Sequence, residues 1–84
     1  MPPEEVTVDL YGTLAAIAGE KRVVVEAATL RDVYRALAEK FPELEEHLDG
    51  NVSVSIDGRI YTEALFEPVS AKNEVVLLPR ISGG

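Results

Sequence analysis

The chain of 84 residues has room for one compact domain, so a single fold has to explain its function. It contains no cysteine, which excludes disulfides, thiolate metal sites and a cysteine nucleophile. The formal net charge of −7, with eight Lys and Arg residues scattered along the chain, argues against nucleic-acid binding; it is compatible with a protein partner that has a basic patch, or with a simple role in solubility.

The first third of the chain predicts a hairpin of two strands. Residues 6–10 alternate apolar and polar side chains with the period of two that is typical of a strand with one buried face. Residues 13–18, bracketed by Gly12 and Gly19, are too few for a helix that is stable alone, so we interpret them as a turn with one helical loop. Residues 21–26 are rich in valine and predict the second strand.

The centre of the chain predicts one amphipathic helix. Thr29 and Asp32 are spaced as in a capping box in which Asp replaces the usual Glu. Apolar side chains then follow at helical spacing, at Leu30, Val33, Tyr34, Leu37 and Phe41. Pro42 ends the helix, because proline has no N–H to donate and disfavours helical geometry in the residue before it. Leu44 and Leu48, four residues apart, indicate a further short helical turn.

A second hairpin follows. Residues 52–56 alternate valine or isoleucine with serine, and the tight-turn dipeptide Asp57-Gly58 leads into a short strand at 59–61. We expect Leu65 and Phe66 to fill part of the core from the loop that comes next.

The final strand decides the topology. Residues 75–78 are four consecutive apolar residues, the pattern of a strand that is covered on both faces, and Pro79 ends it. If the first and last strands lie side by side in the centre of the sheet, the helical crossover requires them to run parallel. The prediction is an α+β protein with the β-grasp arrangement, a mixed sheet of four to five strands wrapped around one main helix. Residues 1–78 would form this domain, and residues 79–84 a flexible C-terminal tail.

The body of the domain offers little chemistry. His47 has no second His or Cys with which to bind a metal, and we interpret it as a surface residue. Ser53 and Ser55 have no neighbouring His to act as a base. No phosphate-binding loop is present, and we expect the chain to bind no cofactor. Without an apolar run of about 20 residues or a signal peptide, the protein is expected to be cytoplasmic and to bind no membrane.

The C-terminal tail is the remaining candidate. A diglycine end has no Cβ, so Gly83 and Gly84 can enter a narrow channel in extended form; the alternative is a frayed terminus, which favours small residues. Residues 79–84 could reach roughly 20 Å. The terminal carboxylate, with an unperturbed pKa of about 3.5, can attack an ATP phosphate, and the resulting anhydride is open to sulfide, thiolate or amine nucleophiles.

Four segments resemble the MoaD/ThiS family of ubiquitin-like sulfur carriers, and together they span essentially the whole chain. They are Val8-Asp9-Leu10-Tyr11-Gly12 with the following 14–19, Ala28-Thr29-Leu30-Arg31-Asp32-Val33, Phe41-Pro42-Glu43-Leu44, and the closing Asn73-Glu74-Val75-Val76-Leu77-Leu78-Pro79-Arg80-Ile81-Ser82-Gly83-Gly84. The closing segment is the most specific of the four. Its ending, together with the length of the chain, looks closer to MoaD than to the shorter thiazole carriers.

This resemblance implies a carrier or co-substrate rather than an enzyme. A ubiquitin-activating-like adenylating enzyme would use ATP to form an acyl-adenylate on Gly84, and a sulfurtransferase would convert it to a thiocarboxylate. In the MoaD branch the carrier is the small subunit of molybdopterin synthase in molybdenum cofactor biosynthesis, and its tail enters the large subunit. The resemblance places partner-binding contacts at Ile60, Leu78, Pro79, Arg80, Ile81 and Ser82, beside Gly83.

Alternatives remain open at this point. In other branches the sulfur goes to tRNA thiolation, to thiamine or to cysteine synthesis, or the tail is joined to lysines as a ubiquitin-like protein modifier. A β-grasp binding module without tail chemistry is a third possibility. Arg80 departs from the second proline that family tails often carry, and it meets either an acidic surface on the partner or solvent. Core packing is the competing interpretation of Ile60 and Leu78, and an exposed patch that contains them would favour the interface.

Overall fold

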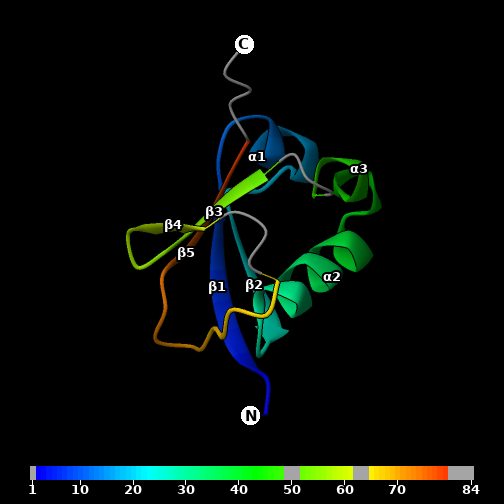
Figure 1. The fold of residues 1–84 in the computed structure, drawn as a ribbon. Coiled ribbons are helices and arrows are strands. Elements are labelled where there is room, and N and C mark those ends of the chain that lie inside the picture. Colours follow the sequence, from blue (N-terminus) through cyan, green and yellow to red (C-terminus); the bar gives the residue numbers. More distant parts are fainter. Residues whose placement is uncertain (1, 49–51, 62–64, 80–84) are drawn as a thin grey trace.

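The computed structural model describes residues 2–48, 52–61 and 65–79 of the chain. Within these residues a five-stranded sheet lies beside a set of helices (Figure 1). The elements in chain order are β1 (Glu4–Leu10), α1 (Thr13–Ala18), β2 (Arg22–Ala27), α2 (Leu30–Lys40), the 3₁₀ turn η1 (Pro42–Leu44), α3 (Glu45–Leu48), β3 (Val52–Ile56), β4 (Arg59–Tyr61) and β5 (Val75–Pro79). None of the helices in the described ranges is long and apolar enough to cross a membrane.

The sheet has the strand order β2-β1-β5-β3-β4, so the first and last strands lie in its interior. β1 and β5 run parallel, with Val8 opposite Val75, and the other neighbouring strands are antiparallel. This order confirms the predicted mixed sheet and the β-grasp fold. The Asp57-Gly58 turn between β3 and β4 is also confirmed, since both residues have the positive φ that a two-residue hairpin turn requires.

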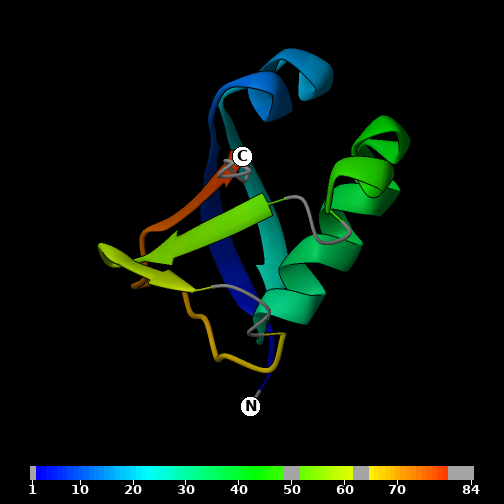
Figure 2. The same cartoon turned by 45° about the horizontal axis from the view of Figure 1, so that its top comes forward.

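One face of the sheet, which we call the inner face, is covered by α2 (Figure 2). Alternate residues of β1, β2 and β3 point to it, and α2 contributes a stripe of three fully buried side chains, Leu30, Val33 and Leu37. Each of these side chains contributes roughly 1.5–3 kcal/mol by leaving water. The opposite face, which we call the outer face, carries the remaining residues of each strand.

The start of α2 is fixed by the predicted capping box. The carboxylate of Asp32 accepts hydrogen bonds from the N–H groups of Ala28 (3.0 Å) and Thr29 (3.2 Å), and the Thr29 hydroxyl accepts one from the N–H of Asp32 (3.4 Å). The hydrogen bond from Ala28 is the main reason that the pKa of Asp32 lies below its ordinary value. The short Asp side chain therefore completes the capping box that Glu usually forms at this position.

The prediction that Leu65 and Phe66 fill the core is wrong. Leu65 is 42 % and Phe66 is 77 % exposed, and Val69 is the buried residue of this segment. The backbone explains the difference, because the carbonyls of Leu65 and Glu67 accept hydrogen bonds from the first N–H groups of α2. A loop that lies along the helix terminus to complete these bonds directs its two bulky side chains to solvent.

Three further predictions need correction. Residues 13–18, predicted as a turn with one helical loop, form a six-residue helix that is ended by the left-handed Gly19 and anchored by the buried Leu14. β5 is not covered on both faces, since Val76 and Leu78 on the outer face are only half-buried. β5 also runs one residue further than predicted, because Pro79 still pairs with β3.

Candidate functional site

β5 leads directly to the predicted functional end of the chain, because residues 80–84 follow Pro79 in the sequence. The strand is held from both sides, by β1 in parallel and by β3 in antiparallel register, with Pro79 opposite Val52. The N–H of Tyr11 adds a further hydrogen bond to the carbonyl of Leu77, with 3.1 Å between nitrogen and oxygen. These bonds hold the end of β5 at Pro79, which we call the tail base after the tail predicted for the residues that follow.

A tight turn after β1 contacts the tail base. In this turn the carbonyl of Tyr11 accepts a hydrogen bond from the N–H of Leu14 at 3.2 Å, and Gly12 has φ 59° and ψ −133°. These angles are those of the first central residue of a type II′ turn, where glycine is strongly favoured. A Cβ at Gly12 would lie 3.0 Å from Cγ of Pro79, so the turn backbone lies directly against the proline ring. Gly12 thus couples the end of β1 to the tail base.

The outer face carries an apolar patch next to the tail base. Ile60 on β4 is 64 % exposed, and Val76 and Leu78 on β5 are half-buried. The register places Ser55 opposite both Ile60 and Val76, and Ser53 opposite Leu78, so these side chains share one face. We call this surface the β4–β5 patch and define it by these five residues. The exposure of Ile60 favours a contact with another protein over core packing for this residue, and the half-buried Leu78 shares its face of the sheet.

The structure thus brings three of the predicted site residues to one region. Ile60 and Leu78 lie in the β4–β5 patch, and Pro79 forms the tail base. The others lie outside the described residues, and their roles stay predictions: Arg80, Ile81, Ser82, Gly83 and Gly84. Sequence reasoning missed Val76, whose position two residues before Leu78 in a strand was the available signal.

A shallow concavity of about 580 Å³ on the other side of the tail base was also not predicted. It is lined by the end of β1, the start of α1 and the residues that lead into β2, and Tyr11 stands at it with 55 % of its surface exposed. Arg22 closes one side, where its Nε donates to Oδ1 of Asp9 at 2.8 Å and this hydrogen bond raises the pKa of Arg22. The concavity adds an aromatic ring and a cation close to the turn at Gly12.

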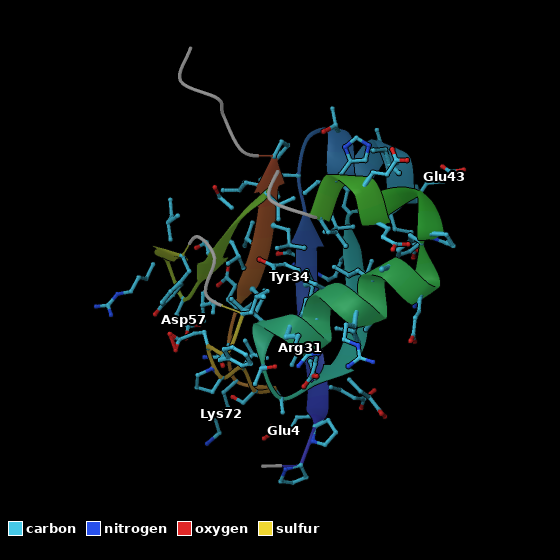
Figure 3. The ribbon with its side chains drawn as sticks, turned by 45° about the vertical axis from the view of Figure 1, so that its right-hand side comes forward. Glu4, Arg31, Tyr34, Glu43, Asp57 and Lys72 are labelled. Carbon is cyan, nitrogen blue, oxygen red and sulfur yellow. The ribbon has the colours of Figure 1, made fainter. Side chains whose placement is uncertain are left out.

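The far end of the sheet serves a structural role. The Asp57 carboxylate accepts hydrogen bonds from the N–H of Glu74 (2.8 Å) and the side-chain amide of Asn73 (2.6 Å), and the first of these is the main cause of its lowered pKa. Figure 3 shows Asp57 and Lys72 in this region, where β5 begins. These bonds fix the entry of β5 just as the turn at Gly12 fixes its exit.

No catalytic constellation occurs in the ranges 2–48, 52–61 and 65–79. His47 is half-buried on α3, and no group of three His, Cys, Asp or Glu side chains in these ranges could hold a metal ion. Ser53 and Ser55 are half-buried on the outer face. The described surface offers the β4–β5 patch and the tail base as places for contact.

Comparison with known proteins identifies the family. The model of the ThiS family matches residues 8–84, which is nearly the whole chain and includes the closing glycines. The chain belongs to the ThiS family. This confirms the resemblance to the MoaD/ThiS group of ubiquitin-like sulfur carriers. No match was found among curated proteins.

Solved structures of similar proteins agree with the ThiS-family fold. Small archaeal modifier protein 1 from Haloferax volcanii is 31 % identical, with a TM-score of 0.80 over 95 % of this chain and 99 % of that one. The protein of the same name from Methanosarcina acetivorans is 26 % identical, with a TM-score of 0.81 over 98 % of each chain. A putative molybdopterin converting factor subunit 1 from Pyrococcus furiosus is 18 % identical, with a TM-score of 0.78 over 93 % and 99 % of the chains, and shows the same fold.

Proposed function

We propose that this ThiS-family protein is a sulfur carrier whose C-terminal Gly84 is activated by a separate adenylating enzyme. The observation that carries the proposal is the arrangement at the end of β5, where an anchored tail base adjoins the exposed β4–β5 patch. A carrier needs a rigid body by which a partner recognises it and a terminus that reaches the partner's active site. In this chain the β-grasp domain is the rigid body, and residues 80–84 in a fully extended conformation would reach about 17 Å beyond Pro79.

The chemistry takes two steps. A carboxylate oxygen of Gly84 attacks the α-phosphorus of ATP, the bond to the β-phosphate oxygen breaks, and pyrophosphate leaves with the acyl-adenylate formed. A hydrosulfide ion released by a sulfurtransferase and a thiol reductant then attacks the carbonyl carbon, AMP leaves with the carboxyl oxygen that it holds, and the S–H proton passes to solvent. The product is a thiocarboxylate, and the enzyme and the sulfur donor supply the catalytic groups for both steps.

We assign recognition by the adenylating enzyme to the β4–β5 patch, to the tail base and to the residues that follow it. Ile60 and Leu78 of the β4–β5 patch dock on an apolar surface of the adenylating enzyme, and Pro79 directs the chain into its active site. Arg80, Ile81 and Ser82 line the entrance channel, where Gly83 and Gly84 pass its narrowest part because they lack a Cβ. The net charge of −7 favours partners with basic surfaces around this contact.

For the recipient of the sulfur we propose a pterin precursor, with this chain as the small subunit of molybdopterin synthase and its tail inserted into the large subunit. The support is the Leu-Pro-x-Ile-Ser-Gly-Gly ending and the fold shared with the molybdopterin converting factor subunit of Pyrococcus furiosus.

A second candidate function is protein modification. Two relatives at 26 % and 31 % identity are called small archaeal modifier proteins, which favours transfer of the activated Gly84 to lysine side chains. In this case the ε-amine of a lysine replaces sulfur as the nucleophile, AMP leaves, and an isopeptide bond forms.

One experiment separates these candidates. The chain is incubated with its adenylating enzyme, ATP and a sulfur donor, and a mass gain of about 16 Da on the C-terminal peptide reports replacement of one oxygen by sulfur. The thiocarboxylated chain is then mixed with the large subunit and the pterin precursor, where loss of this mass gain with formation of molybdopterin supports the first function. Lysines that carry an Ile-Ser-Gly-Gly remnant in a trypsin digest of cell extract support the second, since trypsin cuts after Arg80. Absence of both products with a chain that folds contradicts the proposal.

A further inference from the structure

β2 forms one edge of the sheet. It pairs with β1 along six residue positions, and within the described ranges no strand pairs with its other side. Natural proteins usually protect such edges with a proline, a bulge, an inward-pointing charge or charged side chains along the edge. Of these β2 has only the outer-face charges of Arg22 and Glu26, because its register with β1 is continuous and its inward side chains are Val23, Val25 and Ala27. The edge is therefore open to another strand.

One hydrogen bond between β1 and the residues before β2 shows which backbone groups of β2 point away from β1. The N–H of Leu10 donates to the carbonyl of Lys21 at 2.7 Å, so residue 21 directs its backbone groups toward β1. Backbone direction alternates along a strand, and Val23 and Val25 therefore also face β1. The N–H and C=O groups of Arg22, Val24 and Glu26 point away from the sheet.

The sequence of this edge is complementary to itself. In an antiparallel pair of two β2 strands centred on Val24, Val24 lies opposite its own copy and Arg22 lies opposite Glu26 of the second chain. The residues that meet in this register are the ones whose backbone groups point outward. Their side chains all lie on the outer face, where opposite charges at directly facing positions stabilise a strand pair.

Two features of the single chain favour this pairing. Val24 is 48 % exposed. Glu26 lies opposite Glu5 in the register of β1 and β2, and both side chains are exposed, which makes an unfavourable pair of like charges. Arg22 of a second chain, placed opposite Glu26, would offset this repulsion between Glu5 and Glu26. Arg22 uses its Nε for Asp9, and its two terminal nitrogens remain able to donate to a carboxylate of the second chain.

We propose that the β2 edge joins two copies of this chain about a two-fold axis, so that their sheets become continuous. The contact involves one short strand from each chain, less than a standard interface of about 1,600 Å², so the dimer is expected to be weak and to form only at high protein concentration. The β4–β5 patch lies on strands at the other side of the sheet, and the dimer leaves it and the tail base accessible. The proposal does not depend on the chemistry of Gly84.

Sedimentation equilibrium of the full chain from roughly 10 μM to 1 mM tests the proposal, at about 0.15 M salt so that the net charge of −7 is screened. The wild type should shift from monomer to dimer over this range. Arg22→Glu and Glu26→Arg should each raise the dissociation constant by about tenfold or more, because each variant places like charges opposite one another twice in the symmetric pair.

Mixing the two charge variants provides the most decisive test of the proposed register. Arg22→Glu carries two acidic residues on the edge and Glu26→Arg carries two basic ones, so the two variants should form a heterodimer with each other that neither forms alone. The double variant with both changes should again form a homodimer. Arg59→Glu on β4, at the opposite edge, is the matched charge control and should dimerise like the wild type.

Val24→Pro tests the backbone contribution without a change in charge. The N–H of Val24 points away from β1, so proline at this edge position removes a hydrogen bond of the dimer and none of the monomer. The variant should keep a cooperative thermal transition and stay monomeric at 1 mM. A wild type that is monomeric at 1 mM, or single-charge variants that dimerise like the wild type and do not prefer each other, would overturn the proposal.

Discussion

Substitution of Gly12 by alanine tests how the tail base is built. Gly12 occupies φ 59° and ψ −133° at the turn after β1, and an added Cβ would meet Cγ of Pro79 at 3.0 Å and its Cδ at 3.4 Å. The backbone conformation is open to glycine and costly for residues with a Cβ. Gly19 is the matched control, because its φ of 76° and ψ of 10° are in the left-handed helical region and nothing lies within 4 Å of an added Cβ.

The expected magnitudes follow from these two geometries. A residue with a Cβ in a sparsely populated backbone region costs about 1–3 kcal/mol, and in the left-handed helical region about 1–2 kcal/mol. Alanine also restricts the unfolded chain, which offsets about 0.4–1 kcal/mol in both variants. With the contact to Pro79 added, we expect Gly12→Ala to lose about 2–3 kcal/mol and Gly19→Ala about 1 kcal/mol or less.

Urea unfolding followed by circular dichroism gives both free energies, and thermal unfolding provides a check. For a domain of this size 1 kcal/mol corresponds to about 4–8 °C, so the melting temperature of Gly12→Ala should lie at least about 4 °C below that of Gly19→Ala. If the two variants have equal stability within about 0.5 kcal/mol, the close contact between the turn and Pro79 does not hold the tail base as described.

Three further substitutions test the patch and the helix cap. Ile60→Asp should barely change the unfolding midpoint, because Ile60 is 64 % exposed, but it should slow adenylation of Gly84 roughly tenfold. Phe66→Asp, which changes an exposed residue outside the β4–β5 patch, is the control. Equal adenylation rates for the two variants would rule out the β4–β5 patch as the docking surface. Thr29→Ala should cost about 1 kcal/mol at neutral pH by removing a helix cap, which urea unfolding measures. Asp32→Ala should remove a pH-dependent part of the stability: the pKa of Asp32 is lowered by folding from 3.8, so its stabilising effect is present above about pH 4 and lost as the pH falls through the folded pKa. The stability difference between wild type and Asp32→Ala should therefore shrink below pH 4, and a difference independent of pH would contradict this assignment.

The regular elements could be predicted because local patterns and tertiary packing agree in them. The alternation in residues 6–10 and 52–56, the capping box at Thr29 and the Asp57-Gly58 turn each specify a conformation through nearby residues alone. The parallel pairing of β1 and β5 then follows from the order of the elements.

The errors arose where a side chain's environment depends on distant segments. The apolar run 75–78 indicated a strand covered on both faces, but no layer covers the outer side of β5 in the described residues. Phe66 looked like a core residue, but its loop caps the start of α2 and directs the ring outward. The contact between Gly12 and Pro79 joins residues far apart in the sequence, and no local pattern indicates it.

The central claim is that Gly84 supplies the carboxylate that an adenylating enzyme activates. ATP–pyrophosphate exchange measures this step directly, because labelled pyrophosphate enters ATP only while the acyl-adenylate forms and reverts. With the adenylating enzyme present, we predict exchange that depends on the concentration of this chain and is lost when Gly84 alone is deleted, with the unfolding midpoint unchanged. Exchange at the same rate without Gly84, or no exchange with the intact chain, would contradict the account.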